Sequence, residues 1–352
     1  MRRSCRSVMV GKVVMGANAR VSIQSMTNTP TEDIDRTVEQ ICMLEQAGCD
    51  IVRVSVYNQE CAAALGRIKQ RTKIPIVADI HFDYRLAIAA LENGADKLRV
   101  NPGNIQKPEQ ISAMVDCAKM HHVPIRIGVN AGSISKDMRQ RYGVTPQAMV
   151  QSAMEHVSLL EQRHFQDIII SVKASNVPMM IESYRLLAKE TDYPLHLGVT
   201  EAGDAMQGAI KSAIGIGALL MEGIGDTIRV SLTGDPVQEV VAAQHILRSV
   251  GMYHRGIEII SCPTCGRTRV DIQGMVEQIR KQCSDVSIPL KVAVMGCVVN
   301  GPGEASNADI GIAGGDGKGV LFENGQVVAS FTEDQLVAEL IKRIHARQEA
   351  RG

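Results

Sequence analysis

The sequence of 352 residues predicts an α/β protein in which a (β/α)8 barrel, or TIM barrel, precedes a smaller α+β domain. Between about residues 20 and 250, short segments rich in β-branched residues alternate with segments whose apolar residues recur at helical spacing. The alternation repeats eight times, which favours a closed barrel over the alternative of an open, doubly wound sheet. Beyond residue 254 it gives way to strand-like segments joined by glycine-rich turns.

The expected barrel strands are short and apolar, and a helical segment follows each of them. The first helix shows the pattern: Ile34, Val38, Ile41 and Leu44 recur at helical spacing, and Gly48 ends it. The strands are expected at Val21–Ser25, Ile51–Val56, Ile74–Ile80, Lys97–Asn101, Pro124–Asn130, Asp167–Ala174, Pro194–Thr200 and Asp226–Ser231.

We expect two domains, a barrel over residues 1–253 and an α+β domain over residues 254–352. Residues 8–19 predict a small hairpin that covers the N-terminal mouth of the barrel. The elements expected in the second domain are a strand near 256–261, a helix near 271–283, a strand near 289–296, two or three strands between 309 and 330, and a helix from 332 to about 347.

The composition excludes several classes of protein. Basic and acidic residues are equal in number, 38 of each, which disfavours binding to nucleic acid or to a membrane surface. No apolar run approaches the roughly 20 residues of a membrane span, and no secretory signal follows the N-terminal arginines. Nine cysteines without an export signal indicate a reducing compartment, so we expect a cytoplasmic protein. The sequence has no Gly-x-Gly-x-x-Gly motif, so we expect no nicotinamide or flavin site.

Polar residues gather at the carboxyl ends of the expected barrel strands, where a barrel of this kind carries its active site. Most of them form pairs two residues apart, so that both members of a pair face the same side of the sheet. The residues are Arg53, Ser55, Asp79, His81, Arg99, Asn101, Arg126, Asn130, Lys173, Ser175, Thr200, Glu201, Arg229 and Ser231.

Cations stand at five of these strand ends, namely Arg53, Arg99, Arg126, Lys173 and Arg229. Any one of them is as readily explained by pairing with a carboxylate as by function. Only Asp79 and Glu201 are expected near the five, and unpaired buried cations are costly. Because guanidinium groups bind phosphate oxygens in a bidentate manner, we infer a ligand with several negative charges, such as a diphosphate.

Two further residues at the strand ends have both a structural and a functional interpretation. His81 is either a hydrogen-bonded core histidine or a ligand contact, and its place two residues after Asp79 favours the ligand contact. Glu201 stands between glycines at a strand end, where a carboxylate can act as a general acid or base or can pair with one of the arginines.

Three cysteines in the second domain have the spacing of metal ligands. Cys262 and Cys265 form a Cys-x-x-Cys pair, and Cys297 lies between an expected strand and a glycine–proline loop. The pair alone is compatible with zinc, a redox dithiol or an iron–sulfur cluster. No histidine lies between Gly256 and His345 to complete a zinc site, which favours the cluster.

A cluster held only by cysteine needs four thiolates, so three would leave one iron open to a carboxylate, water or a substrate oxygen. Glu304 is the carboxylate nearest to Cys297 in the sequence and is the candidate for the fourth ligand.

Motifs over nearly the whole chain resemble those of one known family. The segments are VSIQSMTNT (21–29), DIVRVS (50–55), ADIHFDYR (78–85), RVNPGNI (99–105), RIGVNAGS (126–133), TEAG (200–203), CPTC (262–265) and GCVVNGPGE (296–304). Together they resemble the bacterial 4-hydroxy-3-methylbut-2-enyl diphosphate synthases of the methylerythritol phosphate route to isoprenoids. One departure is Asp204, where the family pattern has glycine.

The resemblance implies an iron–sulfur oxidoreductase. It implies a [4Fe–4S] cluster on Cys262, Cys265 and Cys297, with Glu304 on the fourth iron when substrate is absent. The implied reaction is the reductive opening and dehydroxylation of 2-C-methyl-D-erythritol 2,4-cyclodiphosphate. Its two electrons would come from flavodoxin or ferredoxin.

The resemblance also implies roles at the barrel mouth. The five cations would hold the diphosphate, and Glu201 would be the proton donor near the cluster. The implied assembly is a homodimer in which the cluster domain of one subunit covers the barrel of the other. The remaining positions that would contact substrate are His81, Asn101, Asn130, Thr200 and Ser231.

Two other functions are compatible with parts of the pattern. A barrel transferase of the pteroate-synthase type also holds a diphosphate at its mouth, and its second domain would then bind structural zinc. An iron–sulfur sensor or carrier would need complete protein ligation of the cluster and no cationic barrel.

Overall fold

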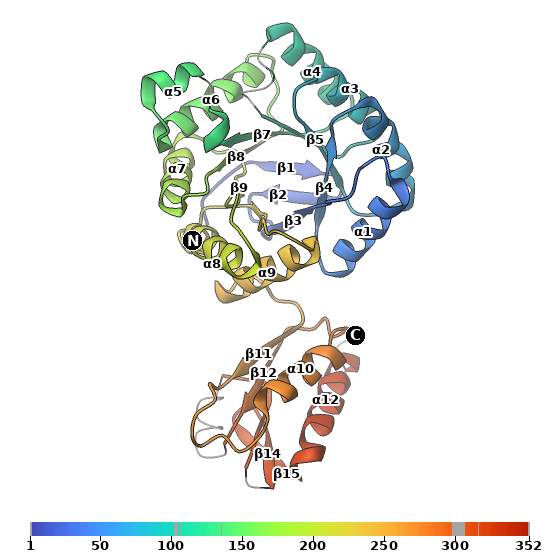
Figure 1. Cartoon of the computed structure of the whole chain (residues 1–352), viewed down its shortest axis with the longest axis vertical. Coiled ribbons are helices and arrows are strands. Elements are labelled where there is room, and N and C mark those ends of the chain that lie inside the picture. Colours follow the sequence, from blue (N-terminus) through green and yellow to red (C-terminus); the bar gives the residue numbers. More distant parts are fainter. Residues whose placement is uncertain are drawn as a thin grey trace. The chain divides into compact units, whose positions relative to one another are not determined.

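A computed structural model describes residues 2–101, 105, 107–134, 136–297, 307–315 and 317–350 of the chain (Figure 1). The chain divides into two compact units, Met1–Met252 and Tyr253–Gly352. Each unit has a sheet and a hydrophobic core of its own.

The first unit is a TIM barrel, which confirms the predicted fold class. Its eight parallel strands follow the order β8-β7-β6-β5-β4-β3-β10-β9, and a bridge between Ile170 and Leu195 joins the two ends of the sheet. The strands are β3 (Ser22–Met26), β4 (Ile51–Val56), β5 (Ile76–Ile80), β6 (Lys97–Val100), β7 (Ile125–Asn130), β8 (Ile168–Lys173), β9 (His196–Leu197) and β10 (Thr227–Ile228).

Helices surround the strands (Figure 1). Most begin at a polar N-cap residue, and Asp204 is one of these: its carboxylate accepts a hydrogen bond from Gln207 N at 2.9 Å. The departure from the family pattern at Asp204 therefore stabilises a helix start. The helices are α1 (Ile34–Gln46), α2 (Gln59–Arg71), α3 (Tyr84–Glu92), α4 (Pro108–Met120), α5 (Lys136–Tyr142), α6 (Pro146–Glu161), α7 (Val177–Glu190), α8 (Ala205–Met221) and α9 (Pro236–Ser249), with a 3-10 turn at Ala131–Ser133.

β9 and β10 are much shorter than the segments Pro194–Thr200 and Asp226–Ser231 predict. Beyond Leu197 the main chains continue side by side but no longer form a regular ladder; Arg229 N still donates to Leu197 O at 3.0 Å. A Cβ on Gly198 would lie 2.7 Å from Arg229 O, so the two segments approach more closely than regular strands do.

The predicted hairpin covers the N-terminal end of the barrel. β1 (Ser7–Val10) and β2 (Val13–Gly16) pair antiparallel. The hairpin side chains of Val8, Val10 and Met15 pack against Ile51 and Val77 near the starts of β4 and β5. This end of the barrel is therefore closed by apolar packing.

The second unit is an α+β domain with one five-stranded sheet. β11, β12 and β13 are parallel, and β14 and β15 continue the sheet antiparallel. No helix among the described residues is long and apolar enough to cross a membrane. The elements are β11 (Ile257–Ser261), α10 (Ile272–Gln282), β12 (Leu290–Met295), β13 (Ile310–Ala313), β14 (Lys318–Glu323), β15 (Gln326–Thr332) and α12 (Glu333–Glu349).

Candidate active site

A cavity of about 280 Å³ lies at the carboxyl ends of the barrel strands. All of the predicted substrate-binding residues line it except Asn101, whose amide instead donates to Ser133 Oγ at 2.9 Å. The lining residues are Met26, Arg53, Ser55, Asp79, His81, Arg99, Arg126, Asn130, Ser171, Lys173, Thr200, Arg229 and Ser231.

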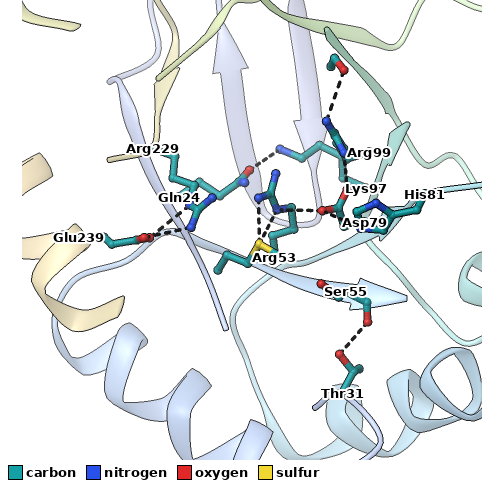
Figure 2. Close-up of polar contacts among 12 residues, drawn as sticks. Gln24, Thr31, Arg53, Ser55, Asp79, His81, Lys97, Arg99, Arg229 and Glu239 are labelled. Atoms are coloured by element: carbon teal, nitrogen blue, oxygen red, sulfur yellow. Dashed lines mark hydrogen bonds and ion pairs between the residues drawn. The ribbon is translucent and has the colours of Figure 1, made fainter. Parts of the chain in front are cut away.

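Asp79 is the centre of an ionic network on one wall of the cavity (Figure 2). Its carboxylate lies 3.0 Å from Arg99 Nη1, 3.5 Å from Arg53 Nε and 3.8 Å from His81 Nε2. Burial raises the pKa of Asp79, but Arg53 and Arg99 outweigh it and lower that pKa to about 2. Asp79 is therefore ionised, and it fixes two of the five cations.

The second carboxylate beside the cations is Glu239, which the sequence analysis missed. Glu239 is buried on α9 and pairs with Arg229, whose Nη2 lies 3.0 Å from Oε1 (Figure 2). The same carboxylate accepts hydrogen bonds from Ser25 Oγ at 2.8 Å and from Leu232 N at 3.1 Å. No local signal distinguishes Glu239, because its neighbours in the sequence follow an ordinary helical pattern.

For Glu201 the sequence left two interpretations open, a general acid or base and a partner to one of the arginines, and the structure shows no such pair among the described residues. Glu201 is exposed and forms no ion pair with any described residue. Its main chain has φ +52°, in the left-handed region that non-glycine residues seldom adopt. Three residues separate Glu201 from the end of β9 (His196–Leu197).

Arg126 and Lys173 are the cations of the cavity without a carboxylate among the described residues. Arg126 is 1% exposed, and its Nε and Nη1 are buried without a hydrogen-bond partner. Lys173 is 7% exposed and has no ion pair or hydrogen bond with a described residue. Unpaired buried cations are unfavourable until an anion reaches them, so this arrangement suits an anionic ligand.

A further buried lysine, Lys97, also escaped the sequence analysis. It is fully buried, and its Nζ donates to Gln24 Oε1 at 3.1 Å (Figure 2). Lys97 precedes Arg99 by two residues on β6, so the period of two that identified Arg99 could also have placed Lys97 inside the barrel.

Gly128 on β7 leaves space for Arg99. A Cβ at this position would lie 2.7 Å from Arg99 Nε and 3.3 Å from both Arg99 Nη2 and Ser171 Oγ. The guanidinium therefore lies across a glycine, and this position allows its contact with Asp79.

In the second unit, adjacent parallel strands bring two of the cysteines to one edge of the sheet. Cys262 follows β11 and Cys297 follows β12, and these strands pair with Ser261 opposite Val294. Gly296 N donates to Cys262 Sγ at 3.2 Å. A backbone N–H therefore points at this sulfur at the strand end.

The third cysteine, Cys265, is exposed, and hydrogen bonds from the backbone and side chain of Arg267 lower its pKa. Three cysteines, of which one accepts a backbone hydrogen bond at its sulfur and another has a lowered pKa, match the donor set of a metal or iron–sulfur centre. Within the described ranges, no three Cys, His, Asp or Glu side chains converge tightly enough to hold a metal ion. Glu304, the predicted fourth ligand, lies outside the described residues.

Solved structures share the barrel fold. Dihydropteroate synthase from Stenotrophomonas maltophilia superposes with a TM-score of 0.53 at 15% identity, covering 70% of this chain and 98% of that one. Type I 3-dehydroquinate dehydratase from Clostridium difficile gives a TM-score of 0.54 at 15% identity, with the same coverage of both chains. At such identities the likeness shows the fold alone.

Sequence comparisons cover both units. Two protein-family models match the chain. The model described as "GcpE TIM-barrel domain" matches residues 5–244, and the model described as "GcpE protein C-terminal domain" matches residues 258–346. Proteins named 4-hydroxy-3-methylbut-2-en-1-yl diphosphate synthase (flavodoxin) are similar over nearly their full length. That from Caldanaerobacter subterraneus is 55% identical over 98% of this chain and 97% of its own. The protein of this name from Clostridium perfringens is 56% identical over 97% of this chain and 99% of its own length. The chain belongs to the family of 4-hydroxy-3-methylbut-2-en-1-yl diphosphate synthases, oxidoreductases of the methylerythritol phosphate route to isoprenoids.

Proposed function

We propose that the barrel cavity binds 2-C-methyl-D-erythritol 2,4-cyclodiphosphate through its diphosphate, for reduction to 4-hydroxy-3-methylbut-2-enyl diphosphate. The observation that carries the proposal is the pair Arg126 and Lys173, two buried cations on the cavity wall without carboxylate partners in the part of the chain that the structure describes. A diphosphate supplies the missing negative charge, and guanidinium and ammonium donors match its oxygens.

The other residues of the site have supporting roles in this proposal. Asp79 holds Arg53 and Arg99 in place, and Glu239 holds Arg229, so that three guanidinium groups are oriented before the ligand arrives. Hydrogen bonds to the ligand come from the polar side chains of the rim, and Asn101 supports the rim through Ser133. Glu201 is the proposed proton donor; its exposure leaves it accessible at the mouth. The polar rim residues are His81, Asn130, Thr200 and Ser231.

Cys262, Cys265 and Cys297 are the residues that would hold a [4Fe–4S] cluster, with Glu304 as the fourth ligand. The positions of Cys262 and Cys297 at adjacent strand ends and the lowered pKa of Cys265 support this assignment. Once bound, the cluster would supply electrons and a Lewis-acidic iron. Reduced flavodoxin, which the names of the relatives include, is the proposed electron donor.

The proposed assembly is a homodimer in which each active site joins the barrel of one subunit to the cluster domain of the other. In support, the cation cavity belongs entirely to the first unit, whereas the three cysteines belong to the second. Reaction in the cavity requires the two to meet.

The experiment that tests the proposed function measures iron, acid-labile sulfide and zinc in protein purified without oxygen, and then turnover of the cyclic diphosphate with reduced flavodoxin. We expect about four irons and four sulfides per chain, as a cubane requires, and product formation. One zinc without sulfide, and no turnover, would contradict the proposal and favour the transferase with structural zinc.

Gly128→Ala is expected to raise the KM for the cyclic diphosphate about tenfold or more, because the new Cβ displaces the Arg99 guanidinium from the cavity wall. Steady-state kinetics measure the effect. Gly217→Ala is the matched control, since a Cβ there has no neighbour within 4 Å and should leave KM unchanged. If Gly128→Ala kept the wild-type KM, the position of Arg99 would not matter for binding.

A further inference from the structure

The barrel interior carries more positive than negative side chains. The carboxylates paired with its cations, in the described part of the chain, are Asp79 and Glu239. Six cations face this interior, namely Arg53, Lys97, Arg99, Arg126, Lys173 and Arg229. If all six were charged, four positive charges would remain unbalanced in a largely buried space, which is strongly unfavourable.

Only the lysines among these cations can relieve the excess. A guanidinium group keeps its proton in proteins, whereas a buried lysine readily becomes a neutral amine. Of the two lysines, Lys97 is fully enclosed and donates to Gln24, while Lys173 lines the cavity where a ligand enters.

Gly198 has no side chain, and this leaves room for the side chain of Lys173. A Cβ on Gly198 would lie 2.5 Å from Lys173 Nζ and 3.0 Å from its Cε, so the glycine provides the space that the amine occupies. This space has no carboxylate partner for Nζ among the described residues. Burial, followed by the charges of Arg126 and Arg229, lowers the pKa of Lys173 well below its usual value.

We propose that Lys173 is a neutral amine in the empty cavity and takes up a proton from solvent when the diphosphate binds. The inference rests on the proposed function, because the anion that recharges Lys173 is the diphosphate of the substrate. The bound negative charge replaces the missing carboxylate and stabilises the ammonium form. The only covalent change is the new N–H bond on Nζ. Substrate binding is then linked to proton uptake, and its affinity falls as pH rises.

The charged and titratable groups around Lys173 come from most of the barrel strands. His196 is fully buried, and neither ring nitrogen has a hydrogen-bond partner among the residues described. Burial lowers its pKa well below the usual range, so it stays neutral. His81 lines the cavity and is the titratable group that faces it besides the lysines. The other charged groups around the cavity are Arg53, Asp79, Arg99, Arg126, Arg229 and Glu239.

The test is calorimetric titration of the full-length protein with the cyclic diphosphate, without reductant, in buffers of different ionisation enthalpy from pH 7 to pH 9. We expect uptake of about one proton per cavity within this range, and a Kd that rises up to tenfold per pH unit. An ordinary lysine, with a pKa of about 10.4, would already be charged and would take up no proton there. Binding without uptake at any pH overturns the inference, and no binding at all overturns the proposed function instead.

Variants assign the proton to one residue. In Lys173→Arg the guanidinium keeps its proton in the empty cavity, so binding is expected without proton uptake. Lys97→Met and His81→Asn should retain the uptake, as should the control Lys12→Met at an exposed position in the β1–β2 turn. Uptake that persists in Lys173→Arg overturns the assignment. The pH series on wild-type protein tests the uptake itself even if a variant does not fold.

Discussion

Arg126→Met is expected to weaken binding of the cyclic diphosphate severely while making the barrel more stable. The guanidinium is 1% exposed, and two of its nitrogens have no partner among the described residues. Removing a buried cation that faces a charged ligand typically costs about 2–5 kcal/mol of binding free energy, or about 30- to 5,000-fold in Kd. The same substitution removes a buried charge whose loss of hydration no partner offsets in the folded protein. The free energy of unfolding should therefore rise by about 1–3 kcal/mol.

Arg229→Met is the matched control for this prediction. It removes the same type of side chain from the same cavity, but Arg229 is paired with buried Glu239. Methionine would leave that carboxylate without its ion pair, so the free energy of unfolding should fall by about 3–5 kcal/mol. Urea denaturation measures both variants, and calorimetry measures binding. Equal losses of stability in the two variants would show that Arg126 is paired in the folded protein and would remove the basis of the proposed anion site.

Mixing two inactive variants is expected to restore activity if the site is shared between subunits. Arg126→Met disables the barrel and Cys297→Ser disables the proposed cluster, so each homodimer should be inactive. In a mixed dimer, the intact barrel of one chain meets the intact cysteines of the other. Random pairing makes about half of the dimers mixed, each with one working site, so co-expression should recover about a quarter of wild-type activity.

The control mixes two variants that both disable the barrel, Arg126→Met and Lys173→Met, and no recovery is expected from them. Differently tagged chains show that mixed dimers form. If mixed dimers of Arg126→Met with Cys297→Ser form but remain inactive, the barrel and the cysteines of one chain work together and the shared site is wrong.

The barrel and its cavity could be predicted from sequence because both follow local periodicities. Helical spacing in segments such as Ile34–Leu44 and alternation along strands such as β4 depend only on near neighbours. Parallel strands end at one edge of the barrel, so residues at corresponding strand ends meet there. This is why Arg53, Arg126 and Lys173 could be brought to one cavity without any knowledge of contacts.

The sequence was therefore sufficient to predict the order of strands and helices, the hairpin at the N-terminal mouth, and the family. The tertiary structure alone decided which cations are paired. Glu239 reaches Arg229 from a helix, Asp79 is shared by two arginines, and Arg126 and Lys173 have no carboxylate partner within the described ranges. Ion pairing depends on distances of a few ångströms between side chains from different elements, and sequence periodicity places a residue on a face but does not measure such distances.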